Sequence, residues 1–203
     1  AVEELKGATE QIRFKRKKVR LNYILAQIYQ LLQNYPLAQK HYEIVLRSNP
    51  EYDMAFSAKM NLARSLEAGS SDTKKMRDKL LKMVKDDKNK EYLDQIYFTI
   101  AEMDVSNQDT TSAIKNYILS TNNSVENNSQ KVLSFLALAE IYFAKKLYRS
   151  AKTYYDSTVV HMEKNFRLYE ETNSIHLVLS DLVAQINTIE RQDSLQMVAK
   201  LPK

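Results

Sequence analysis

Residues 138–155 read Leu-Ala-Glu-Ile-Tyr-Phe-Ala-Lys-Lys-Leu-Tyr-Arg-Ser-Ala-Lys-Thr-Tyr-Tyr, and this segment decides the fold class of the chain. Two of its small residues, Ala139 and Ala151, allow two antiparallel helices to approach closely. Tyr142 and Tyr155 then fill the space on either side of that contact. A small side chain that faces a large one gives dense packing without a void. The segment therefore predicts a tightly packed pair of helices.

The same pattern recurs along the chain at intervals of 37 or 38 residues. The small residues of the first helices are Ala26, Ala63, Ala101 and Ala139. The corresponding positions of the second helices are Ala38, Met76, Ala113 and Ala151, each followed by a large residue, Tyr42, Leu80, Tyr117 or Tyr155. A fixed period of this length is typical of repeat arrays. We predict four helix-turn-helix repeats, at about 19–50, 52–88, 91–122 and 130–164.

The composition agrees with an all-α protein. Only 2 Gly and 3 Pro occur in 203 residues, which leaves little sequence for β-turns. We expect a single repeat domain over residues 1–203, as a continuous array and as a fragment of a longer protein. The net charge, 30 − 25 = +5, is a mild excess and does not by itself indicate nucleic-acid binding. With 0 Cys, the segment has no disulfide, no thiolate metal ligand and no lipid-bearing cysteine.

The flanks and turns carry more local signals. Residues 3–33 predict one long helix or two helices with a break near Gly7, and residues 172–200 predict a helical cap for the open end of the array. Within that cap, residues 192–198 are interpreted either as a short second helix or as the start of sequence that is missing here. Proline should begin the second helix of repeat one at Pro36 and end it at Pro50. Ser71 or Asp72 should cap the helix that follows them, and residues 121–129 should form a surface loop.

No set of residues with catalytic spacing is present, so we expect neither an enzyme nor a bound cofactor. The three histidines, His41, His161 and His176, are far apart in sequence, and a structural role suits them better than metal binding. Gly-rich phosphate loops and nucleophile elbows are absent from the sequence. Asp104 stands out because an aromatic residue is expected at its position. Either it faces a polar groove, or its helix ends early.

The first helices of such an array line its concave face. The predicted protein-binding groove contains two residues from each first helix, one before and one after the packing alanine. One further aromatic residue lies a turn beyond the last pair. These are Tyr23 and Gln27, Met60 and Arg64, Phe98 and Glu102, Leu136 and Glu140, and finally Phe143. Large apolar residues exposed along a groove indicate a protein ligand. The alternative is that these side chains contact the neighbouring repeat or the C-terminal helix.

A basic patch precedes the first repeat. Its cations are Arg13, Lys15, Arg16, Lys17, Lys18 and Arg20. One interpretation is a solvated helix face that leads into the repeat. The other is a docking site for an acidic partner or for anionic lipid head groups. One Phe in the segment is too few aromatic residues for a stacking platform, so we expect no nucleic acid.

The repeats resemble the tetratricopeptide (TPR) family, whose helix-turn-helix unit has about 34 residues. The resemblance covers about residues 19–165. It is closest in the first copy, at Leu25, Ala26, Tyr29, Ala38, Tyr42 and Pro50, and in the fourth, at Phe135, Leu138, Ala139, Tyr142, Ala151 and Tyr155. It implies an all-α, right-handed superhelical solenoid of antiparallel helix pairs with flanking helices at both ends.

Longer segments are similar to the SprE/PorW lipoproteins of the type IX secretion and gliding-motility machinery of Bacteroidetes. These segments are residues 17–21, 61–65, 88–97, 138–143 and 192–196. The resemblance implies a periplasmic protein that is tethered to the outer membrane and required for protein secretion. Its lipid anchor would lie upstream of Ala1, and its partners would be ring or translocon proteins. We therefore expect a non-enzymatic interaction scaffold; the alternative is a generic TPR adaptor whose basic N-terminal helix docks on an anionic partner or membrane surface.

Overall fold

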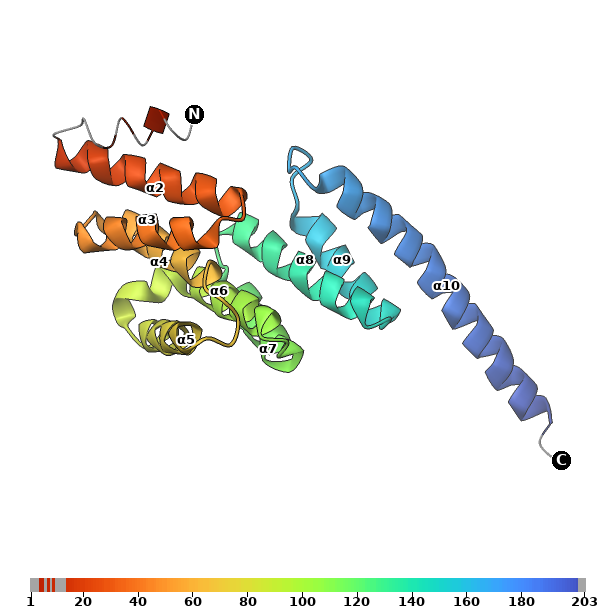
Figure 1. Ribbon diagram of the computed structural model, residues 1–203. Coiled ribbons are helices and arrows are strands. Elements are labelled where there is room, and N and C mark those ends of the chain that lie inside the picture. The colour runs from red at the N-terminus through yellow and green to blue at the C-terminus, as the bar shows by residue number, and fades with distance from the viewer. Residues whose placement is uncertain (1–3, 6, 8, 10–13, 201–203) are drawn as a thin grey trace. The chain divides into compact units, whose positions relative to one another are not determined.

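The computed structural model describes residues 4, 5, 7, 9 and 14–200, and every regular element in them is helical (Figure 1). The α-helices are α2 (Lys15–Leu31), α3 (Tyr35–Arg47), α4 (Tyr52–Arg64), α5 (Ser71–Val84), α6 (Leu93–Ser106), α7 (Thr110–Asn123), α8 (Asn128–Ala144), α9 (Tyr148–His161) and α10 (Tyr169–Ala199). A 3-10 helix, η1 (Asp87–Tyr92), joins α5 to α6. The all-α prediction is confirmed. No helix in this described part of the chain is long and apolar enough to cross a membrane.

The chain forms two compact units, residues 1–109 and residues 110–203. The first unit contains α2 to α6, and the second contains α7 to α10. The boundary between them falls in the turn between α6 and α7, inside the third predicted repeat.

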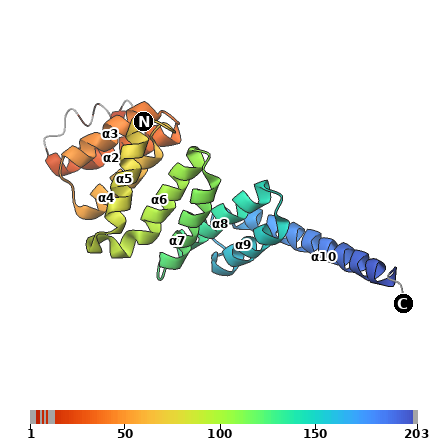
Figure 2. The ribbon, with the colours of Figure 1, turned by 90° about the horizontal axis from the view of Figure 1, so that it is seen from below.

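In the first unit, α2 packs against α3, and α3 packs against α4, as Figure 2 also shows. Ala26 of α2, Ala38 of α3 and Tyr42 of α3 are completely buried in one hydrophobic core. Because alanine has the smallest apolar side chain, the two helices approach closely at this point, and the tyrosine ring fills the space beside them. This is the packing that the first copy of the repeat pattern predicts.

The second predicted pair is looser than the first. Helix α5 packs mainly against α6 and η1, and contacts α4 less extensively. Met76, which stands in the place of the small residue, is 8% exposed and contributes its side chain to the core. A methionine at this position prevents the close approach that alanine permits, although its flexible chain fills irregular space well. The replacement of the small residue by methionine thus goes together with a less extensive contact between α4 and α5.

Three turns end their first helix in the same way. Gln33, Gln108 and Lys146 have positive φ angles of 56°, 62° and 58°. The next amide in each turn donates a hydrogen bond back across the helix end: Asn34 N to Tyr29 O, Asp109 N to Asp104 O and Leu147 N to Tyr142 O, at 2.8, 2.9 and 3.0 Å. This is the Schellman arrangement, which satisfies carbonyl groups that the helix end leaves without partners. Glycine usually occupies the positive-φ position, so the sequence does not predict these turns.

The helix starts agree in part with the predictions. Pro36 lies in the first turn of α3, and the Asn34 side chain accepts a hydrogen bond from Leu37 N at 3.3 Å. The predicted cap of α5 is wrong, because Ser70 accepts the bond from Thr73 N at 3.2 Å, whereas Ser71 and Asp72 already belong to the helix. The predicted loop at 121–129 is also too long, since α7 continues to Asn123.

In the second unit, α8 and α9 form the tightest helix pair. Ala139 and Ala151 are completely buried in a core that also contains Leu136, Tyr155 and, from α10, Leu179. Helix α10 packs against α9 and continues without a break to Ala199, so the first of the two interpretations of residues 192–198, a short second helix, is wrong. Residues 186–198 contain no glycine or proline, and the helix therefore extends well beyond its last buried side chain, Val183.

We predict that Ala139→Phe lowers the free energy of unfolding by about 1–3 kcal/mol, because the larger ring overpacks the α8–α9 contact. Thermal or denaturant unfolding measures this effect. Ala144→Phe, at an exposed position on the same helix, is the matched control and should leave stability nearly unchanged. Equal stability of the Ala139→Phe variant and the original chain would contradict the packing described here.

Candidate binding surfaces

The predicted groove is less apolar at its surface than the sequence suggests. Met60, Phe98 and Leu136 are 3%, 8% and 7% exposed, so their large side chains belong to the interior. Tyr23, Arg64 and Glu102 are partly buried, and the remaining members, Gln27, Glu140 and Phe143, are exposed. The accessible part of the predicted groove is therefore mainly polar.

A ladder of polar side chains connects three first helices in the first unit. Asn61 Nδ2 of α4 donates a hydrogen bond to Tyr23 Oη of α2 at 3.4 Å. Arg64, one turn along α4, donates from Nη1 to Asn61 Oδ1 at 3.1 Å and from Nε to Glu102 Oε2 of α6 at 2.5 Å. Tyr23 and Asn61 are 38 residues apart, as are Arg64 and Glu102. Equivalent positions of successive repeats thus bind each other, as the alternative interpretation of the groove predicts.

Aromatic rings support the same ladder. The Arg64 guanidinium lies over the Phe98 ring at 5.7 Å from its centroid. Tyr23 meets Tyr42 edge-on, with ring centroids 6.0 Å apart, and Tyr42 Oη donates to Gln30 Oε1 at 2.7 Å. Burial raises the pKa of Tyr42 well above its ordinary value, so the phenol is neutral and acts as a hydrogen-bond donor. These contacts hold the ladder in one conformation.

Two hollows adjoin the Arg64–Glu102 ion pair. The smaller, of about 140 Å³, is lined by both residues and by Ala63, Leu66 and Thr73, among others. The larger, of about 560 Å³, lies between the start of α3 and the turn after α4, with Arg64, Tyr35 and Gln39 in its walls. Burial raises the pKa of Glu102, while the Arg64 cation opposes that increase. The pair therefore offers both a hydrogen-bond donor and an acceptor beside open space.

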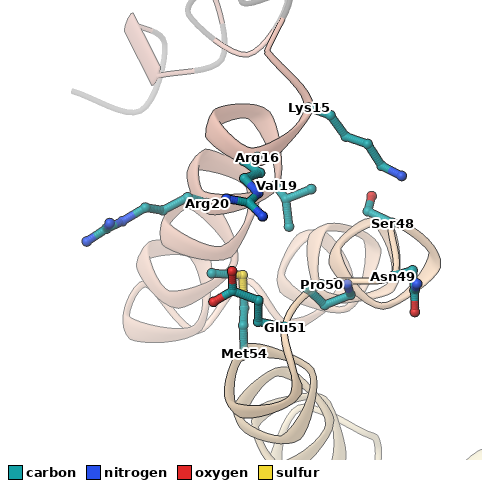
Figure 3. A pocket seen from close by; sticks show the side chains of 9 residues that line it. All are labelled: Lys15, Arg16, Val19, Arg20, Ser48, Asn49, Pro50, Glu51 and Met54. Atoms are coloured by element: carbon teal, nitrogen blue, oxygen red, sulfur yellow. The ribbon is translucent and has the colours of Figure 1, made fainter.

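Part of the predicted basic patch lines a second kind of surface, a pocket of about 470 Å³ (Figure 3). Arg13 lies outside the described residues. Lys15, Arg16 and Arg20 of α2 line one wall, together with Val19. The opposite wall is formed by the end of α3, the turn that follows it and the start of α4, through Ser48, Asn49, Pro50, Glu51 and Met54. Lys17 and Lys18 do not line the pocket, and Lys17 lies over the Phe14 ring at 5.4 Å.

The turn opposite α2 has the geometry that its sequence requires. Asn49 has a φ of 50°, a left-handed conformation that asparagine tolerates better than most residues. Pro50 follows and prevents α3 from continuing. The Ser48 hydroxyl donates to Ile44 O at 2.7 Å and so closes the end of α3. Sequence reasoning found the basic wall from its charge, but it did not find this facing wall, because only folding brings residues 48–54 beside α2.

Asp104 is neither at an early helix end nor in an open groove. Helix α6 continues past it to Ser106, and the Asp104 side chain is only 4% exposed. Arg77 of α5 donates to both of its carboxylate oxygens, from Nε at 2.8 Å and from Nη2 at 3.3 Å. The hydrogen bond and the charge of Asp104 raise the pKa of Arg77. Asp104 therefore joins α5 to α6 in place of an aromatic contact.

The histidines have structural partners. His41 Nδ1 lies 2.8 Å from Asn22 Oδ1, and its ring stacks on Tyr29. His161 stacks on Phe135, and His176 Nε2 lies 2.8 Å from Asp156 Oδ1. Across the residues that the structure describes, no three acidic, histidine or cysteine side chains are grouped in a way that could hold a metal ion.

Comparison with known proteins yields no match to a family model and none to a curated protein.

We predict that Arg77→Ala lowers the free energy of unfolding by about 1–3 kcal/mol, because it removes a bidentate partner from a buried carboxylate. Chemical denaturation measures the loss. Arg47→Ala is the control, since Arg47 pairs with Glu43 on an exposed helix surface and its removal should cost less than about 0.5 kcal/mol. Equal effects of the two substitutions would show that the Arg77–Asp104 pair does not join α5 to α6.

Proposed function

We propose that this chain is a non-enzymatic protein–protein interaction scaffold, built as a TPR-like, right-handed superhelical array of antiparallel helix pairs. The observation that carries the proposal is the ladder from Tyr23 through Asn61 and Arg64 to Glu102. It fixes side chains of three successive first helices at the spacing of the repeat. Side chains that are already ordered lose less conformational entropy when a ligand binds.

The accessible groove residues define what such a ligand would meet. Gln27, Glu140 and Phe143 are exposed, and Arg64 and Glu102 border open hollows. In the first unit, amide, guanidinium and carboxylate groups can hydrogen-bond to the backbone of an extended or helical segment; in the second unit, Phe143 offers apolar area beside the Glu140 carboxylate. A protein segment suits this mixture of groups better than a small apolar ligand does.

The biological setting that we propose is the type IX secretion and gliding-motility machinery. The basis is the sequence resemblance to the SprE/PorW lipoproteins. In this proposal the chain lies in the periplasm, a lipid anchor outside this segment tethers it to the outer membrane, and ring or translocon proteins are its partners. It binds no cofactor and no nucleic acid.

A second candidate function is a generic adaptor that uses its basic N-terminal helix. The pocket beside Lys15, Arg16 and Arg20 favours this candidate. The two functions are compatible, because the pocket and the ladder use different residues of the first unit.

The test of the groove is capture of type IX ring and translocon proteins from a Bacteroidetes envelope extract. The variant is Gln27→Ala, Glu140→Ala and Phe143→Ala together, all at exposed positions. We predict that capture falls about tenfold or more, as expected when central contact residues are truncated. The matched control replaces the exposed Lys40, Lys79 and Lys115 of the second helices with alanine.

Equal capture by the groove variant and the original chain would contradict the groove as the binding face. If the original chain captures none of these secretion proteins, the type IX assignment is wrong.

A further inference from the structure

The basic pocket combines an excess of positive charge with an apolar interior. Three cations, Lys15, Arg16 and Arg20, line it, whereas Glu51 is its only carboxylate among the described lining residues. None of the three cations makes an ion pair with another described residue. In Figure 3, Lys15 extends beside Ser48 at the end of α3, and Arg20 extends outward on the other side of α2. The positive charge is therefore available to a ligand.

The position of these cations is unfavourable for the helix that carries them. Lys15 and Arg16 are the first two residues of α2, and the first turn contains no acidic residue. The N-terminal end of a helix carries a partial positive charge, which cations at that end reinforce. The Phe14 side chain provides no capping hydrogen bond there. A bound anionic group would relieve this repulsion, so local stability and ligand binding are coupled at this site.

The interior of the pocket adds a second requirement. Val19, Pro50 and Met54 supply apolar surface between the two walls. Val19 is buried, and Met54 packs against the hydrophobic core of the first unit, so this surface is held in place from behind. A ligand that carried only negative charge would leave it hydrated. Burial of an apolar side chain there would strengthen binding, because apolar surface is removed from water.

We propose that this pocket binds an acidic segment of a partner protein, with one apolar side chain flanked by Asp or Glu residues. The apolar side chain lies against Val19, Pro50 and Met54, and the flanking carboxylates pair with Lys15 and Arg16. This proposal rests on the proposed scaffold function and names a contact site and a chemical class of partner for it.

The shape and composition of the site favour a peptide over the other anionic ligands. A bilayer surface is broad, and its head groups could reach the cations at the rim but not the apolar surface between the walls. Single-stranded nucleic acid binds through aromatic rings on which successive bases stack, and no aromatic residue lines this pocket in the described structure. An acidic peptide with an apolar residue matches both the charge and the interior.

The experiment measures fluorescence anisotropy of the labelled peptide Gly-Asp-Glu-Leu-Glu-Asp-Gly with the whole 203-residue chain. We expect saturable binding that weakens as salt is added, because the Debye length falls to about 8 Å at 0.15 M ionic strength. Replacement of the peptide's leucine by serine should weaken binding about tenfold, because the apolar contact is lost. This comparison needs no change in the protein.

The matched protein variants reverse two charges each on the same helix. Lys15→Glu with Arg16→Glu changes the pocket wall, and Lys17→Glu with Lys18→Glu changes cations that do not line it. We expect about tenfold weaker binding for the first pair and less than about twofold for the second, because charge effects are strongest at direct contacts. Circular dichroism verifies that both variants keep their helical content.

Three results would overturn the proposal. Equal losses for the two double variants would indicate diffuse surface charge, and equal affinity for the leucine and serine peptides would show that the interior is not used. Binding to phosphatidylserine vesicles or to oligothymidylate, without binding of the peptide, would assign the site to a membrane or to nucleic acid. If secretion-protein capture fails while the peptide still binds, the type IX assignment is wrong and the pocket proposal stands. If capture succeeds and the peptide does not bind, the type IX assignment stands and the pocket proposal is wrong.

Discussion

The contact between a small residue of one helix and a small residue of the next is the constraint on which the rest of the structure depends. Ala139 with Ala151, and Ala26 with Ala38, are completely buried where their helices meet. At such a contact any larger side chain has to displace its neighbours, since protein interiors are close-packed. The partner ring, Tyr155 or Tyr42, then fills the remaining space. Where Met76 replaces the small residue, α5 packs mainly against α6 and η1 and less extensively against α4. The Arg77–Asp104 ion pair joins α5 to α6 there.

The order of the helices is predictable from the sequence, because the packing alanines and the large residues after them recur at intervals of 37 or 38 residues. The two proline signals, Pro36 and Pro50, also place the start and end of α3 to within a few residues of its bounds, Tyr35–Arg47. The turns at Gln33, Gln108 and Lys146 are not predictable in this way, because their left-handed residues are not glycine. The partners of Arg77 and Arg64 are not predictable either. They depend on which helix lies beside which, and single-sequence periodicity contains no such information.

The two candidate surfaces differ in how much of each can be predicted from the sequence. Helical geometry predicts the groove positions, yet Met60, Phe98 and Leu136 are buried, and Tyr23, Arg64 and Glu102 contact neighbouring repeats. Charge alone predicts the basic patch, and the fold provides the facing wall at residues 48–54 that completes the pocket. The ladder mainly holds α2, α4 and α6 of the first unit together. The accessible chemistry lies at the exposed groove residues Gln27, Glu140 and Phe143, in the polar hollows beside Arg64 and in the basic pocket.

The most direct test of this account is a double-mutant cycle on Arg64→Ala and Glu102→Ala, measured by equilibrium unfolding. The two residues are 38 positions apart and joined by one ion pair, so their coupling reports contact between successive repeats. We predict a coupling energy of about 0.5–3 kcal/mol, as found for residues in one network. Effects that add to within about 0.3–0.5 kcal/mol would mean that the residues are independent, and would contradict the ladder as the element that holds neighbouring first helices together.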